Sequence, residues 1–174
     1  MTVKGNNVPF TLALRIPEWC IGFEAPNLDG AVVEEKDGYL YITRSWGKEE
    51  SFALEFPMEA RQYMADANVR EDIGKVAVMR GPVVYCLEEV DNGKDLHLIT
   101  LPADAKFTTE MFRFRDMDVV SLKAEGFRQK KQEMKGLYCP LTVCAEEVQT
   151  LRFIPYFTWA NRGENEMTVW IRER

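Results

Sequence analysis

The recurrence of short extended runs is the feature that most constrains the fold of this 174-residue chain. Candidate strands recur at intervals of about 8 to 15 residues, separated by Gly, Pro and Asp, and no segment sustains a helical apolar period. This pattern predicts an all-β sandwich. The chain is long enough for one domain or two small ones, and the polar gap at residues 66–74 marks the expected boundary between two subdomains.

The strongest local signal is an Asp37-Gly38 pair between two extended runs, residues 31–36 and 39–44. An Asp-Gly pair suits a two-residue hairpin turn, because both turn positions require a positive φ. Residues 9–16 also alternate apolar and polar side chains, as a half-buried strand does. We therefore expect a hairpin and a further strand within the first 50 or so residues of the sequence.

Residues 75–89 are expected to form the centre of the fold, as two short strands joined at Gly81-Pro82. Residues 148–159 carry apolar side chains at both odd and even positions. A strand that is apolar on both faces is normally covered on both faces. Both segments are therefore expected to form buried core and to contribute no reactive groups.

Charge and hydropathy exclude two classes of partner. The formal net charge is −6, with a pI near 5.0, so the sequence predicts no nucleic-acid partner. No stretch approaches the roughly 18 apolar residues of a membrane span, and the N-terminus does not resemble a secretory leader, so no membrane partner is expected. The sequence does not define a cellular compartment.

The four cysteines predict neither a metal site nor a disulfide framework. Zinc ligands are usually paired two to four residues apart, and only Cys139 and Cys144 are close; on a continuous strand these two side chains would point to opposite faces. Cys20 and Cys86 stand alone in the sequence. The expected role of these residues is that of small buried hydrophobes.

No catalytic constellation is visible in the sequence, so no catalytic residue is predicted. Adjacent acids such as Glu88-Glu89 would face opposite ways on a strand, and we expect them to form a solvated surface. The single histidine, His97, lies in an apolar run and is expected to be a structural strand residue. Sugar stacking is the remaining option, and Trp46 and Trp159, both near strand ends, are its candidate residues.

Four motifs in order resemble the C-terminal part of the β-L-arabinofuranosidase-like proteins of glycoside hydrolase family 127. They are Phe10-Thr-Leu-Ala-Leu-Arg-Ile-Pro-Glu-Trp19, Tyr41-Ile-Thr-Arg-Ser-Trp46, Lys75-Val-Ala-Val-Met-Arg-Gly-Pro-Val-Val-Tyr-Cys-Leu-Glu88, and Ile154-Pro-Tyr-Phe-Thr-Trp-Ala-Asn-Arg-Gly163 followed by Met167-Thr-Val-Trp170. The resemblance covers nearly the whole chain.

The resemblance implies a catalytic (α/α)6 barrel that lies outside this chain. In the family this barrel carries a cysteine nucleophile and a zinc ion held by cysteines and a glutamate, and two β-sandwiches follow it. The paired-cysteine motif of the family is absent here. The resemblance therefore implies no cofactor in this chain and zinc only in the catalytic domain.

The resemblance also implies two jelly-roll-like sandwiches, of which the first is discontinuous. Residues 1–65 plus 161–174 would form the first, without its opening strands, and residues 66–160 would form the second as an insertion. An exposed edge left by missing strands would favour self-association. The expected partners are thus the chain's own catalytic domain and a second copy of the chain, with Tyr156, Asn161 and Arg162 as candidate interdomain contacts.

Three hypotheses follow from the sequence. In the first, the chain is a non-catalytic scaffold within a glycoside hydrolase. In the second, it is an independent carbohydrate-binding module that uses exposed tryptophans, and burial of those tryptophans would remove it. In the third, it is a protein-interaction domain unrelated to sugars.

Overall fold

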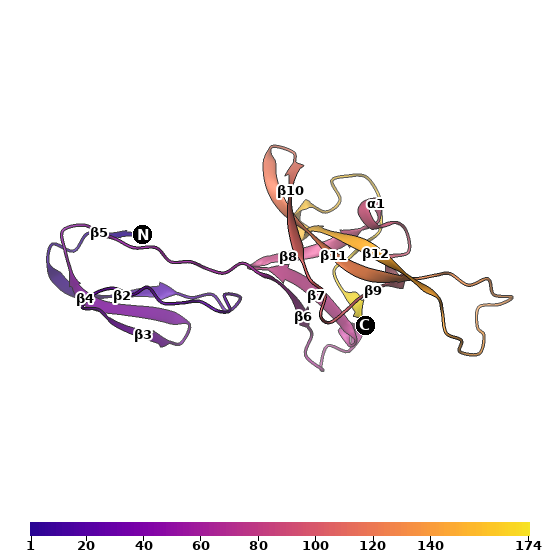
Figure 1. Cartoon of the computed structure of the whole chain (residues 1–174), viewed down its shortest axis with the longest axis horizontal. Helices are drawn as coiled ribbons and strands as arrows, with labels where there is room; N and C mark the ends of the chain where they lie inside the picture. Colours follow the sequence, from indigo (N-terminus) through magenta and orange to yellow (C-terminus); the bar gives the residue numbers. More distant parts are fainter. The chain divides into compact units, whose positions relative to one another are not determined.

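The computed structural model describes every residue from Met1 to Arg174. The chain is almost entirely β and divides into two compact units, Met1–Glu59 and Ala60–Arg174, which we call the N-terminal and C-terminal units (Figure 1). The all-β class predicted from the alternating runs is confirmed. None of the helices is long and apolar enough to cross a bilayer.

The N-terminal unit holds a three-stranded antiparallel sheet and a small two-stranded one. In the larger sheet, β4 (Tyr39–Trp46) lies between β2 (Val8–Arg15) and β3 (Val32–Lys36). In the smaller, β1 (Thr2–Val3) pairs with β5 (Glu50–Ser51). The predicted strand over residues 9–16 corresponds to β2.

The hairpin predicted at Asp37-Gly38 is confirmed. Lys36 pairs with Tyr39 across the turn, and Asp37 and Gly38 have φ angles of +52° and +76°. Positive φ at both central positions matches the twist of the two strands, and glycine adopts it without strain.

The core of the N-terminal unit lies on one face of β4. Leu40, Ile42 and Trp46 occupy even positions, which point to the same side of a strand, and all three are fully buried. They pack with Val3 and with a set of partly buried apolar residues: Leu12, Leu14, Ile16, Phe23, Leu28, Ala31, Phe52 and Leu54.

The C-terminal unit is built on one nine-stranded sheet. Its strands are β6 (Ala60–Met64), β7 (Lys75–Arg80), β8 (Val83–Glu88), β9 (Ile99–Leu101), β10 (Thr108–Phe114), β11 (Met117–Gln129), β12 (Glu146–Pro155), β13 (Met167–Thr168) and β14 (Ile171–Glu173). The sheet order is β13-β8-β12-β11-β9-β14-β7-β6, with β10 beside β11 and a further pairing of β8 with β7. Short helical turns connect some strands: η1 (Arg70–Asp72), α1 (Glu89–Asn92), η2 (Leu96–Leu98) and η3 (Tyr156–Thr158).

The centre of this unit is the pair predicted from residues 75–89. β7 and β8 pair antiparallel on either side of Gly81-Pro82. On β12, the neighbouring residues Phe153 and Ile154 are both buried, so both faces of this strand are covered as expected. His97 lies exposed in η2 rather than in a strand.

The C-terminal segment differs from the discontinuous arrangement expected for residues 161–174. β13 pairs with β8, and β14 pairs with β7 and β9, so the segment completes the sheet of the C-terminal unit. Ile171 is buried there opposite Val76. Removal of its apolar side chain from water in this core favours the place of β14 in this sheet. The division between the units falls after Glu59, because β6 pairs with β7.

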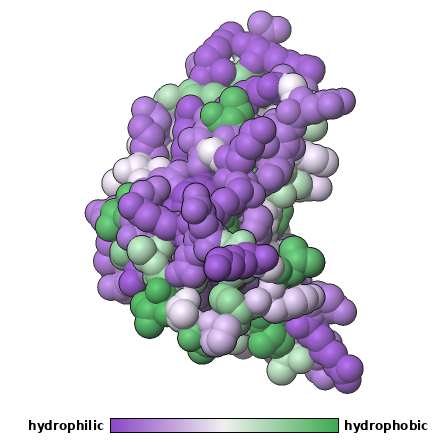
Figure 2. Space-filling view, turned by 90° about the vertical axis from the view of Figure 1, so that its right-hand side faces the viewer, coloured by the Kyte–Doolittle hydropathy of each residue, from purple (hydrophilic) through white to green (hydrophobic).

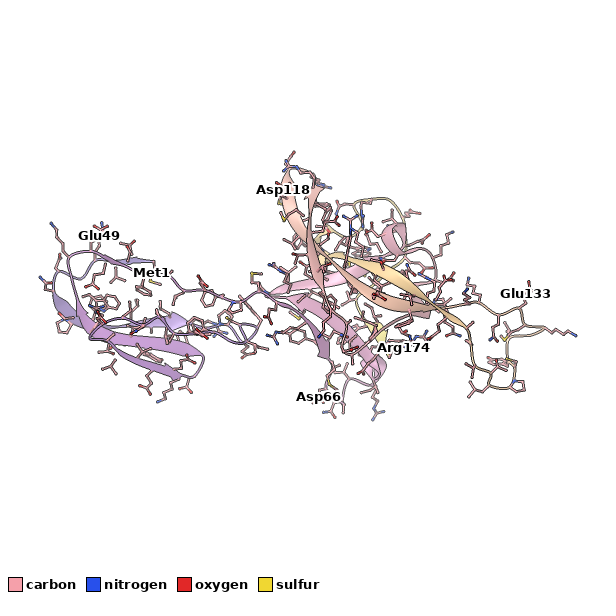
Figure 3. All side chains as sticks on the ribbon, viewed as in Figure 1. Met1, Glu49, Asp66, Asp118, Glu133 and Arg174 are labelled. Atoms are coloured by element: carbon pink, nitrogen blue, oxygen red, sulfur yellow. The ribbon has the colours of Figure 1, made fainter.

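A long connection separates β11 from β12. β11 continues to Gln129, which pairs with Glu146 of β12. Residues 130–145, which we call the arm, project from this end of the two strands, and Glu133 marks their position in Figure 3.

Candidate functional site

Four of the five residues singled out in the sequence lie in one loop of the C-terminal unit. This loop, residues 156–165, begins with η3 directly after β12 and leads toward β13. It contains Tyr156, Trp159, Asn161 and Arg162. The structure therefore brings a candidate sugar-stacking residue together with all three candidate contact residues.

Arg162 holds the loop to the sheet through two acids. Its Nε donates to Oε2 of Glu88 at 2.9 Å, and its Nη1 donates to Oδ1 of Asp91 at 3.0 Å. Its Nη2 contacts both carboxylates. The backbone N–H of Ala160 donates to the other oxygen of Glu88 at 3.1 Å. We call Glu88, Asp91 and Arg162 the brace.

Local structure explains how the brace forms. Glu88 is the last residue of β8, where the three preceding residues are buried, and Asp91 lies in α1, which follows at once. A carboxylate with no exposed surface needs a cation and hydrogen bonds to replace its hydration. Arg162 supplies both in a planar geometry that fits carboxylates.

The solvated role expected for the pair Glu88-Glu89 is wrong for Glu88. Its side chain is fully buried. The available signal was its position at the end of a strand whose other residues are apolar, which demands a buried partner of opposite charge. The partner, 74 residues further along the chain, is not indicated by any local pattern.

The brace affects the pKa of two groups, Arg162 within it and the nearby Cys86. Burial acts to lower the pKa of the Arg162 guanidinium, but the hydrogen bonds to Asp91 and Glu88 together with the negative charges of these two acids outweigh burial and raise it. Burial, helped by the charge of Glu88, raises the pKa of the Cys86 thiol to about 12. Arg162 therefore stays charged and Cys86 stays protonated near neutral pH.

The same loop presents a pair of aromatic rings. Tyr156 and Trp159 stack with centroids 5.9 Å apart and an interplanar angle of 21°, and they are 44% and 38% exposed. Asn161 Nδ2 donates to the carbonyl of Trp159 at 2.8 Å, while its Oδ1 accepts a 2.6 Å hydrogen bond from Arg115. The rings thus form a small apolar shelf, and the brace holds the loop that carries them to the sheet.

Trp46, the other candidate for sugar stacking, is not available for that role. It is fully buried in the N-terminal unit, its indole N–H donates to the carbonyl of Phe10 at 3.1 Å, and it stacks on Phe10 and Phe52. A Cβ on Gly5 would lie 2.2 Å from Cβ of Trp46, so the backbone at Gly5 packs directly against the base of this side chain. The period of two that places Trp46 on the face of Leu40 was the signal for its burial.

The potential metal ligands of this chain do not fit the zinc site that the family resemblance implies. All four cysteines are free, and Cys86 is a protonated thiol in the core. Cys139 lies exposed on the arm. His, Cys, Asp and Glu side chains form no group of three or more suited to a metal. We therefore assign no metal chemistry to these residues.

Family models match almost the entire chain, in two pieces. Residues 1–58 match the β-L-arabinofuranosidase GH127 middle domain, and residues 60–172 match the glycoside hydrolase family 127 C-terminal domain. The chain belongs to glycoside hydrolase family 127. The boundary between the two matches coincides with the boundary between the two units.

Individual family 127 proteins are similar over nearly the full length of the chain. The non-reducing end β-L-arabinofuranosidase of Bifidobacterium longum subsp. longum is 39% identical over 171 residues, which is 91% of this chain and 25% of that protein. A crystal structure of a GH127 β-L-arabinofuranosidase from Geobacillus stearothermophilus T6 is 38% identical, with a TM-score of 0.81 over 96% of this chain and 27% of that one. A GH127 β-arabinofuranosidase structure is 28% identical, with a TM-score of 0.73. The chain spans about a quarter of the length of these family 127 relatives.

The brace is not arranged as the acid and base of a hydrolase. Both oxygens of Glu88 accept hydrogen bonds from within the chain, and both oxygens of Asp91 contact Arg162. A general acid or base must instead reach a proton of the substrate. Within this family 127 chain, the arrangement is suited to fixing the shape of a loop.

Proposed function

We propose that this chain is the accessory β portion of a glycoside hydrolase acting on β-L-arabinofuranosides, and that it supports the catalytic portion without supplying a reacting group. The matches to the middle and C-terminal domain models and the names of the relatives support this proposal. The zinc ion implied by the family resemblance would lie in the catalytic portion.

The observation that carries the proposal is the exposed aromatic shelf on a braced loop. Tyr156 and Trp159 are large, stiff side chains on a loop fixed through Arg162, which is the kind of group that anchors protein interfaces. A loop that is already ordered loses little entropy on contact. We therefore propose this shelf as the contact with the catalytic portion, which makes Arg162 a positioning residue and Trp159 a contact residue.

The carbohydrate-binding alternative has less support. Trp46 is buried, so the two tryptophans cannot form a shared platform for a sugar. A second copy of the chain as partner remains a proposal, and the experiment below includes a readout for it.

The test compares Trp159→Ala with Met111→Ala in the full-length enzyme that contains this chain. Met111 is 63% exposed on β10, so it matches the loss of an exposed apolar side chain away from the shelf. We expect Trp159→Ala to lower the melting temperature of the catalytic portion by several degrees, and Met111→Ala to change it little. Light scattering on both variants reports whether the number of copies changes.

Two results would overturn the proposal. The first is turnover of an aryl β-L-arabinofuranoside by the purified 174-residue chain, free of other hydrolases. The second is identical melting of the catalytic portion in the two variants.

A further inference from the structure

The arm between β11 and β12 carries apolar side chains that nothing in its unit covers. Residues 136–145 include no charged residue, although 29% of the whole chain is charged. Leu137, Tyr138, Leu141 and Val143 are between 87% and 101% exposed. Figure 2 views the molecule from the side toward which the arm points in Figure 1, and shows hydrophobic residues among hydrophilic ones on this face.

The base of the arm is fixed, whereas its tip forms only local contacts. At the base, the N–H of Lys130 donates to the carbonyl of Ala145 at 2.8 Å, and Lys131 pairs with Asp95 at 2.6 Å. Nearer the tip, the hydroxyl of Thr142 lies 3.2 Å from Oε1 of Gln132. The direction in which the arm leaves the sheet is therefore set by the ladder of β11 and β12, while its apolar tip stays uncovered.

A simple connection between two strands does not need this composition. Loops that only link strands are usually polar, because exposed apolar side chains gain nothing from water. A run of large apolar residues without charge, presented away from the body of a domain, is characteristic of a contact surface. The absence of charge at the tip also indicates that its partner is apolar.

We propose that the arm docks into an apolar groove on the catalytic portion of the same polypeptide, and this proposal rests on the function proposed above. The relatives are about four times as long as this chain, so most of such a protein lies outside the 174 residues. A groove on the same polypeptide meets the arm at a high effective concentration. The arm would thus be a second contact, separate from the aromatic shelf.

The experiment measures cleavage of the arm by chymotrypsin in the full-length enzyme. Tyr138 supplies a cleavage site at the tip of the arm. The arm variant is Leu137→Ser with Leu141→Ser and Val143→Ser, and the control variant is Met64→Ser with Met111→Ser and Met117→Ser, three exposed methionines of the same unit. We expect cleavage at Tyr138 to be slow in the wild type and the control, and at least about tenfold faster in the arm variant.

Rapid cleavage at Tyr138 in the wild-type enzyme would overturn the proposal, because a docked tip is not accessible to a protease. Slow cleavage that becomes fast on dilution, together with a change from two copies to one by light scattering, would also overturn it in favour of a second copy as the partner. Since both measurements use the wild type, they remain decisive if the arm variant does not fold.

The outcome is separable from that of the proposed function. If the arm is cleaved rapidly but Trp159→Ala still lowers the melting temperature of the catalytic portion, only the docking of the arm fails. If the purified chain itself hydrolyses the arabinofuranoside, the proposed function fails whatever the arm does.

Discussion

The 156–165 loop and the arm are two exposed apolar features of the C-terminal unit, and they differ in how the rest of the unit supports them. The 156–165 loop presents Tyr156 and Trp159 and is held by a partly exposed arginine that pairs with two largely buried acids, and its backbone is tied to Glu88. The arm presents a longer apolar run over no such support. Under the contacts proposed above, the loop would be shaped before it meets its partner, whereas the arm would take its final shape from the partner.

The difference shows how one unit can combine two kinds of contact. A contact that is ordered in advance loses little entropy on binding and favours one geometry. A contact that becomes ordered on binding loses more entropy but adapts to the surface that it meets. Under the functions proposed here, the loop would fix the orientation of the catalytic portion and the arm would add area.

The largest effect is expected from removing the brace that holds the loop. Arg162→Ala leaves the buried Glu88 without its cation, while Asp91 keeps only Arg152, at 3.4 Å, and we expect the free energy of unfolding of the C-terminal unit to fall by about 3 to 5 kcal/mol. Urea unfolding followed by circular dichroism measures this change. The control is Arg113→Ala, which removes an exposed ion pair to Asp118 at 3.1 Å and should cost no more than about 1 kcal/mol. Equal effects of the two variants would contradict the role of the brace.

Alkylation of the cysteines compares the same two regions without mutation. Cys86 is buried near the brace with a pKa raised to about 12, so at pH 8 almost all of it is the unreactive protonated thiol. Cys139 is exposed on the arm. We expect iodoacetamide at pH 8 to modify Cys139 at least about 100-fold faster than Cys86, as measured by peptide mass spectrometry. Because the raised pKa belongs to the folded state, the difference should collapse when urea unfolds the chain, and its persistence in urea would argue against burial as the cause.

The aromatic shelf itself should contribute much less to stability than its support. Removing the stack with Trp159→Ala should lower the free energy of unfolding of the isolated chain by about 1 kcal/mol. A double-mutant cycle with Tyr156→Ala should yield a coupling energy of about 0.5 to 1.5 kcal/mol. Zero coupling would mean that the two rings do not stack in solution.

The smallest effect is expected at the tip of the arm. Leu141 has no covering contact, so Leu141→Ser should change the free energy of unfolding of the isolated chain by less than about 0.5 kcal/mol. Chemical denaturation in the same buffer as for the Arg162 variant measures it. A loss above 1 kcal/mol, taken as about twice the usual surface effect, would mean that the tip packs against the chain after all.

Features set by neighbouring residues were predictable from the sequence. The turn at Asp37-Gly38 follows from its two residues, and the paired strands around Gly81-Pro82 follow from alternation and a break. Phe153 and Ile154 were expected to be buried on opposite faces, and they are. Each of these signals lies within a window of a few residues.

Features set by distant partners were not predictable in the same way. The place of the last strand depends on which core buries Ile171, and no pattern in residues 161–174 distinguishes one sheet from another. The brace joins residues more than 70 positions apart, so Arg162 was visible only as part of a motif and not as the partner of Glu88.

Because Trp46 is buried, its fluorescence can report whether the N-terminal unit is folded. An indole in a dry core emits at shorter wavelength than one in water, and Trp46 has its ring covered and its N–H bonded. Trp159 emits from a partly wet surface of the C-terminal unit. With Trp19, Trp159 and Trp170 replaced by Phe, the emission wavelength of the remaining tryptophan would report the melting of Met1–Glu59 alone, so the folding of this unit could be timed separately from that of the C-terminal unit.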